Sequence, residues 1–134
     1  MRALLLMLLA ASSLRCGGRD LVVPMQSQNN SGEDGATTFT QHGARLTVKI
    51  SVTPSADQGP QAAHLHPGQC GELGGALSVL PGGGQAVALR PVVQGISETE
   101  LSGVTIDQLT GGRYSINLHY SKDPTLYVSC GELP

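Results

Sequence analysis

Three histidines offer the clearest chemistry in this sequence. His64 and His66 form a His-x-His pair, and His119 stands near the end of a later alternating segment. Residues two apart on a strand point to the same face, so both imidazoles of the pair can reach one metal ion. Neutral imidazole is a common ligand of copper and zinc. The pattern predicts a metal site at His64, His66 and His119, and the alternative is three solvated histidines.

The segments around these histidines predict the face on which each one lies. Ala63 and Leu65 are expected to face the core, which turns His64 and His66 outward. In the segment 113–120, apolar residues alternate with Ser115, Asn117 and His119. We therefore expect all three histidines on the polar, outward faces of their strands.

Copper is the expected ion, with zinc as its main competitor. A set of nitrogen ligands accommodates both Cu(I) and Cu(II) with modest rearrangement. Glu72 and Asp123 are the acidic residues that could add an oxygen ligand. His42 lies in a turn between Gln41 and Gly43, where a solvated side chain is expected.

The N-terminal residues resemble an export signal. Arg2 precedes an apolar run over 3–11 that is too short to cross a bilayer as a helix, and small residues follow it. Cys16-Gly17-Gly18 resembles a lipobox, in which the cysteine is acylated, although Ser13 and Arg15 stand where leucine and a small residue are usual. We predict a signal peptide over 1–15, a lipidated Cys16 that attaches the protein to a membrane, a linker over 16–20, and a location in the periplasm or on the outer surface.

The two remaining cysteines, Cys70 and Cys130, are expected to form a disulfide. Pairs of cysteines in an oxidising compartment usually close. The closed loop would hold about sixty residues and stabilise the fold by about 4 kcal/mol. The alternative is two buried free thiols.

The charge balance excludes nucleic-acid binding. The chain has 8 basic and 10 acidic residues. Removal of residues 1–15 takes away Arg2 and Arg15, which leaves 8 − 2 = 6 basic residues and a net charge of about −4. A chain with this charge and few aromatic residues lacks the basic surface that nucleic acids require.

Alternation of apolar and polar residues predicts an all-β fold. It is clearest over 45–53, where every second residue is apolar. Turn residues separate the short segments, which is typical of a Greek-key β-sandwich or flattened barrel. We expect about seven or eight antiparallel strands in one domain over 21–134. The strands are expected over 21–25, 36–40, 45–53, 61–66, 98–106, 113–120 and 125–129, with one helical turn over 105–109.

Four segments resemble Cu/Zn superoxide dismutases, and the resemblance covers about residues 21–131. The segments are 31–52, AHLHPGQC over 63–70, GGRYSINLH over 111–119 and VSCG over 128–131. The chain looks most like compact, exported, superoxide dismutase-like proteins of bacteria, and more loosely like CHRD-type domains. The resemblance implies a Greek-key sandwich, copper ligands at His64, His66 and His119, and a disulfide between Cys70 and Cys130.

The chain also departs from that enzyme pattern. It has no histidine between Cys70 and Glu98, so the bridging histidine and the zinc ligands are absent. Tyr127 stands where the resemblance places the active-site arginine, and the loop after His119 is short. Three functions stay open. One is an exported copper protein with copper-only dismutase activity on superoxide. Another is a copper buffer that exchanges copper with a donor or acceptor, and the third is a metal-free scaffold.

Overall fold

Seven strands and one short helix make up the part of the chain that the computed structural model describes, residues 17–81, 85–111 and 113–134. The predicted signal peptide and Cys16 lie outside these residues. No helix within the described ranges is long and apolar enough to cross a membrane. The elements are β1 (Arg19–Ser27), β2 (Gly35–His42), β3 (Arg45–Val52), β4 (Ala63–Pro67), β5 (Ile96–Ser102), α1 (Ile106–Leu109), β6 (Tyr114–Tyr120) and β7 (Asp123–Glu132).

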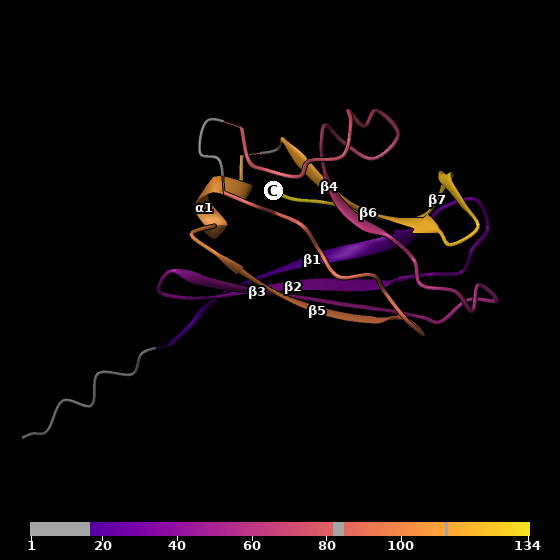
Figure 1. Ribbon diagram of the computed structural model, residues 1–134, viewed down its shortest axis with the longest axis horizontal. Helices are drawn as coiled ribbons and strands as arrows, with labels where there is room; N and C mark the ends of the chain where they lie inside the picture. Colours follow the sequence, from indigo (N-terminus) through magenta and orange to yellow (C-terminus); the bar gives the residue numbers. More distant parts are fainter. Residues whose placement is uncertain (1–16, 82–84, 112) are drawn as a thin grey trace, which may run out of the picture.

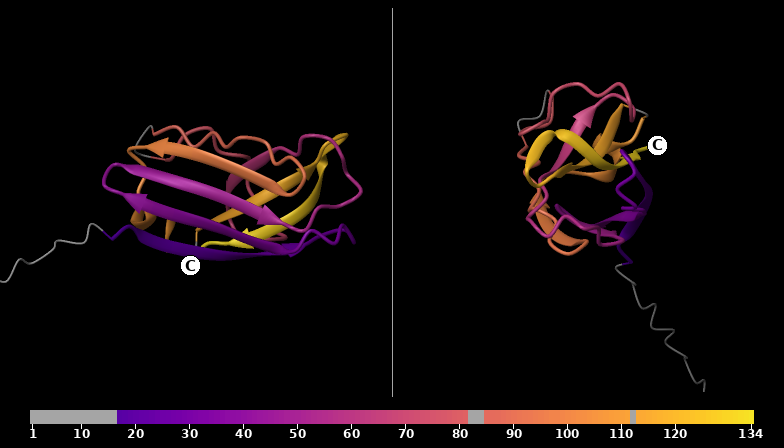
Figure 2. Two further views of the ribbon diagram at one scale, coloured as in Figure 1. Left: turned by 90° about the horizontal axis from the view of Figure 1, so that it is seen from below. Right: turned by 90° about the vertical axis from the view of Figure 1, so that its right-hand side faces the viewer.

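The strands form one antiparallel sheet in the order β4-β6-β7-β1-β2-β3-β5. The long strand β1 joins its two halves, because its first part pairs with β2 and its last residues pair with β7. The sheet curls into a half-barrel, which the two views of Figure 2 show. The all-β class, the antiparallel arrangement and the number of strands are thus confirmed, in the flattened-barrel form.

The core fills the concave side of this sheet. On β3, Leu46, Val48, Ile50 and Val52 are buried whereas Lys49 is exposed, so the alternation predicted there is confirmed. Apolar side chains of the other strands meet them, and the largest fully buried ones include Phe39, Leu65, Ile116 and Leu118.

A long connection between β4 and β5 runs over the open side of the half-barrel (Figure 1). It stays close to the sheet because Leu77 N–H donates to the Leu65 carbonyl at 2.8 Å and Gln61 forms a bridge with Val92. Three of its own side chains, Leu80, Val87 and Val92, are buried and complete the core.

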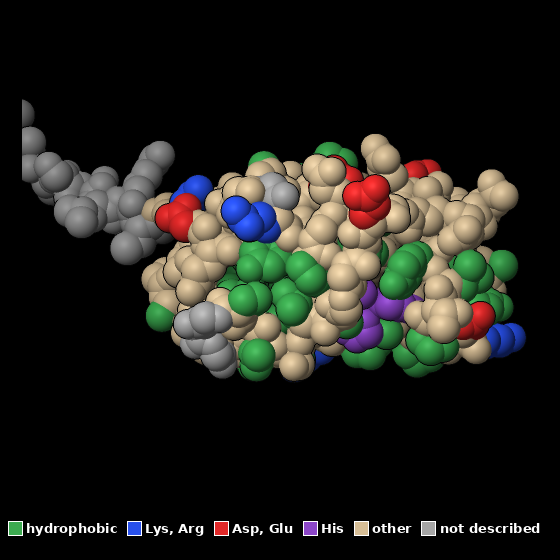
Figure 3. Space-filling model, turned by 90° about the horizontal axis from the view of Figure 1, so that it is seen from above, with side chains coloured by type: hydrophobic (Ala, Val, Ile, Leu, Met, Phe, Trp, Pro, Cys, Tyr) green, Lys and Arg blue, Asp and Glu red, His purple; other side chains and the backbone are tan. Residues whose placement is uncertain are grey.

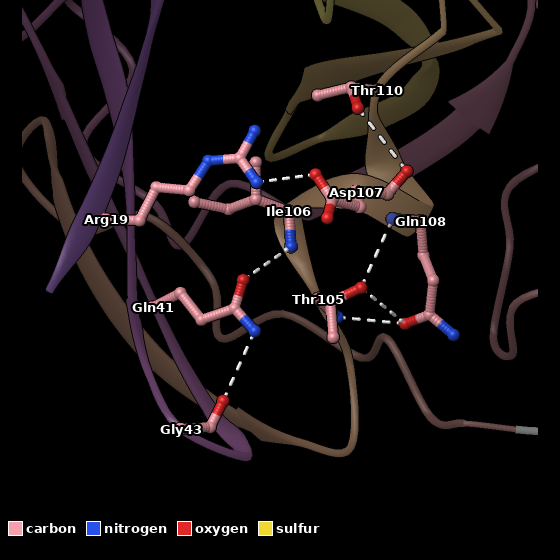
Figure 4. A network of polar contacts seen from close by, with 8 residues as sticks. All are labelled: Arg19, Gln41, Gly43, Thr105, Ile106, Asp107, Gln108 and Thr110. Carbon is pink, nitrogen blue, oxygen red and sulfur yellow. Dashed lines mark hydrogen bonds and ion pairs between the residues drawn. The ribbon is translucent and has the colours of Figure 1, made fainter.

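Helix α1 is the single turn that the sequence predicts over 105–109. Thr105 caps it, since its side chain accepts from Gln108 N–H while the Gln108 side chain accepts from Thr105 N–H. The side chain of Gln41 in β2 accepts from Ile106 N–H at 3.0 Å (Figure 4).

The start of β1 corrects the predicted linker over 16–20. Arg19 and Asp20 already belong to β1, opposite Gln41 and Thr40. The backbone of these two residues pairs with β2, because β2 extends as far as His42. Arg19 also forms an exposed ion pair with Asp107 of α1 (Figure 4).

Candidate metal site

Three imidazoles gather on the outer face of β4 and β6. His64 and His66 lie two residues apart on β4, and His119 lies on β6, diagonal to His64. The ring centroids of His64 and His119 are 4.7 Å apart, those of His66 and His119 5.7 Å, and those of His64 and His66 6.0 Å. One ring nitrogen from each histidine lies within 4.8 Å of the other two. This cluster could hold a metal ion.

Backbone carbonyls orient two of these rings. His66 Nδ1 lies 2.8 Å from the Gly74 carbonyl oxygen, and His119 Nδ1 lies 2.6 Å from that of Pro124. A carbonyl only accepts, so each Nδ1 carries the proton and each Nε2 keeps a lone pair that can accept a hydrogen bond or bind a metal. Metal-binding histidines are usually fixed by this kind of hydrogen bond. His66 Nε2 is buried and finds no hydrogen-bond partner among the described residues.

The third ring, His64, points its Nδ1 toward the other two histidines, whereas His66 and His119 use Nδ1 to bind backbone carbonyls. His64 Nδ1 lies 2.9 Å from His119 Nε2. Because His119 Nε2 accepts, His64 Nδ1 carries the proton in this arrangement, and a metal on that nitrogen would require the other tautomer, with the proton on His64 Nε2. Two nitrogens on one ion at about 2.0–2.1 Å are about 3.3–3.6 Å apart in tetrahedral or trigonal geometry. The pair thus has to separate by only about half an ångström.

The surroundings favour the neutral form of His64 and His66. Burial lowers the pKa of His64, and the neighbouring His119 and His66 lower it further. Burial also lowers the pKa of His66, while the hydrogen bond to Gly74 opposes this effect and His119 adds to it. Since only a neutral imidazole binds a metal, these shifts favour the ligand form at neutral pH.

The histidines lie on the predicted outward face of the sheet, but this face is covered, so the alternative of three solvated histidines is wrong. His66 and His119 are only 2% and 5% exposed, and His64 is half-buried. A covering loop, residues 68–78, crosses this face of the sheet. It is held there by Ser115 Oγ, which donates to the Gly68 carbonyl at 2.7 Å, and by the hydrogen bond from His66 to Gly74.

The disulfide between Cys70 and Cys130 is confirmed, with Cα atoms 6.0 Å apart. It joins the covering loop to β7. Cys70 N–H also donates to a Glu132 carboxylate oxygen at 3.0 Å, which adds a second tie to the same strand. The crosslink therefore holds the loop whose Gly74 carbonyl orients His66.

Comparison with known protein families assigns most of this chain to one family. A family model described as the CHRD domain matches residues 17–129. The chain belongs to the CHRD family. No curated protein matches it.

Membership of the CHRD family corrects the dismutase resemblance. The family model that matches residues 17–129, almost the whole domain, is that of the CHRD domain and not that of the dismutases. Identification with Cu/Zn superoxide dismutases is therefore wrong, and the looser resemblance to CHRD-type domains points to the right family. The missing bridging histidine, zinc ligands and arginine agree with this correction.

Tyr127 forms one wall of the histidine cluster in this CHRD domain. Its ring meets that of His119 edge-on with centroids 4.9 Å apart, and the centroid of His66 is 6.0 Å away. An aromatic ring thus lies where the dismutase resemblance would place a cation. The sequence predicts this replacement, but the packing of the ring against His119 depends on the folded sheet.

The cluster is accessible from one side. In Figure 3, histidine side chains come to the surface beside an area of hydrophobic side chains. A cleft of about 220 Å³ borders His64 there, and its other lining residues are uncharged: Ala76, Leu77, Ser78, Ala88 and Leu89.

Other residues proposed from the sequence do not join the cluster. His42 is exposed at the end of β2, in the other half of the sheet. Glu72 and Asp123 are exposed as well, and Asp123 accepts hydrogen bonds from Thr125. Within the described residues, no carboxylate lies with the three histidines.

Proposed function

We propose that this CHRD domain is an exported copper-binding protein with one site formed by His64, His66 and His119. The observation that carries the proposal is the convergence of three ring nitrogens within 4.8 Å of one another. The free Nε2 of His66, buried without a partner in the described chain, supports it further.

The donor set fits copper, with zinc as its competitor. Closed structural zinc sites take four protein ligands and often thiolates, whereas an open three-histidine zinc site keeps a water in the fourth position. Here both cysteines near the cluster are consumed by the disulfide, and no carboxylate joins the three described imidazoles. Three neutral nitrogens suit Cu(I), and Cu(II) can add oxygen ligands in a tetragonal arrangement.

The surroundings favour holding or exchanging copper over turnover of an anion. The cleft beside His64 has no charged residue in its lining, and the ring of Tyr127 rather than a cation packs against His119. The chain also has a net charge of −2, which opposes attraction of an anionic substrate. We propose a copper donor or acceptor as the partner of this site.

The disulfide supports the proposed export, because such bonds persist in oxidising compartments. The signal peptide over 1–15 and the lipid on Cys16 stay predictions. Mass spectrometry of the protein from a membrane fraction tests both. A mature chain that starts at Cys16 with added acyl mass is expected, and an unmodified Cys16 would contradict the anchor.

Copper titration of the oxidised protein tests the proposed function. We expect one Cu(II) per chain, with nitrogen hyperfine structure in the electron paramagnetic resonance spectrum. His64→Ala and His119→Ala should abolish this signal. His42→Ala is the matched control, because it removes an exposed histidine far from the cluster.

Three results would overturn the proposal. They are no binding at all, equal losses in the His42→Ala and His64→Ala variants, or zinc displacing copper from the wild type at equal concentration. The metal-free scaffold predicts the first result and a melting temperature that copper does not change. Superoxide turnover no greater than that of free copper is expected.

A further inference from the structure

A buried amide lies in the middle of the histidine cluster. Asn117 is fully buried, and neither its Oδ1 nor its Nδ2 has a hydrogen-bond partner among the described residues. Buried side-chain amides are nearly always hydrogen-bonded, and leaving such a group without a partner costs about 1–3 kcal/mol. The side chain therefore needs an explanation.

Its position follows from the strand register. Asn117 on β6 lies directly opposite His64 on β4, so the two side chains share the outer face, with Cβ atoms about 4.5–5.5 Å apart. His66 is its diagonal neighbour, and His119 is two residues further along the same strand. Asn117 is thus adjacent to all three histidines.

The neighbouring polar residue on the same face behaves differently. Ser115 is equally buried, but its hydroxyl donates to the Gly68 carbonyl of the covering loop. The loop offers Asn117 no such partner. The buried atoms that lack partners on this part of the face are His66 Nε2 and the two amide atoms of Asn117, which all belong to described residues. A single ion between these two side chains would satisfy the nitrogen and the amide oxygen together.

We propose that Asn117 Oδ1 is a fourth ligand of the copper site, which makes the site three nitrogens and one oxygen. This inference rests on the proposed function. An amide oxygen is a hard donor that suits Cu(II) in a tetragonal N,O set, whereas Cu(I) is satisfied by the three imidazoles. Asn117 therefore favours the oxidised ion.

The test compares the affinities of Cu(II) and Cu(I). Asn117→Leu removes the oxygen and keeps a side chain of similar length. We expect it to weaken Cu(II) binding about tenfold or more, with Cu(I) binding unchanged, so that the Cu(II)/Cu(I) potential rises by about 59 mV for each tenfold loss. Competition titrations with chelators for each oxidation state measure both affinities.

Thr37→Val is the matched control. Thr37 is also fully buried with an unpartnered hydroxyl, but it lies on β2, in the other half of the sheet. Both variants remove a buried polar group, and both should keep or raise the melting temperature of the metal-free protein. Only Asn117→Leu should change Cu(II) binding.

The outcomes separate the two proposals. Equal Cu(II) affinities in wild type and Asn117→Leu, or equal losses for both oxidation states, would overturn the fourth ligand and leave the three-histidine site intact. A wild-type protein that binds no copper would overturn both. If Asn117→Leu does not fold, Asn117→Asp carries the test: a carboxylate oxygen on the ion must change the Cu(II) resonance parameters, and an unchanged spectrum would overturn the inference.

Discussion

Loss of the disulfide is expected to remove a large share of the stability of this domain. Cys70 and Cys130 are 60 residues apart in sequence. In the chain-entropy model, opening a loop of that length gives the unfolded chain about 14 cal/mol/K of entropy, or about 4 kcal/mol at 25 °C. Small domains have free energies of unfolding of about 5–15 kcal/mol, so this loss brings the protein close to instability.

The assay is urea unfolding of the metal-free double variant Cys70→Ser/Cys130→Ser, followed by circular dichroism beside the oxidised wild type. Wild-type protein unfolded in the presence of a reductant should match the double variant, which controls for the two serines. A fall of less than about 1 kcal/mol with an unchanged urea dependence would refute the reasoning. It would show that the unfolded chain is restrained without the crosslink.

Three further predictions concern the titration of the histidines, the covering loop and helix α1. Because the pKa of His64 and of His66 is lowered from the ordinary value near 6.5, the unfolded chain binds more protons below that pH. The free energy of unfolding should therefore fall as pH drops through about 6.5, and urea titrations that show no such fall would contradict these pKa shifts. Gly68→Ala should lower the free energy of unfolding by about 1–3 kcal/mol and weaken copper binding. Gly68 has φ +97°, and an added Cβ would lie 2.4 Å from the Glu72 carbonyl oxygen. An unchanged melting temperature and copper affinity would argue against a fixed covering loop. Thr105→Ala should lower the free energy of unfolding by about 1 kcal/mol, because it removes the cap of α1. Thermal unfolding measures this loss, and the control Thr105→Ser should retain most of the stability of the wild type.

Much of the fold could be predicted from the sequence because its determinants are local. Alternation over 45–53 marks β3 because apolar residues there must share one face. The capping pair Thr105 and Gln108 likewise marks α1. The start of β1 could not be predicted in this way. Arg19 and Asp20 are polar and become part of the strand only because β2 offers them backbone partners.

The candidate site was predictable in its ligands but not in its environment. Spacing and alternation placed His64, His66 and His119 on outward faces. They could not show that the covering loop buries them, since that depends on long-range contacts such as the hydrogen bond from His66 to Gly74. The role proposed for Asn117 was hidden for the same reason, because the register that sets it opposite His64 is a property of the folded sheet.

The burial of the site is itself an argument that something binds there. A sheet face that served only as scaffold could leave its histidines in water at no cost. Here the fold buries His66 and Asn117 with atoms that lack partners in the described chain, each at a cost of about 1–3 kcal/mol. A ligand present at one hundred times its dissociation constant stabilises the folded state by about 2.7 kcal/mol, which is enough to offset one such group. We therefore expect copper to raise the melting temperature of the wild-type domain. In the His66→Ala variant, which lacks one of the proposed ligands, copper should raise the melting temperature less or not at all.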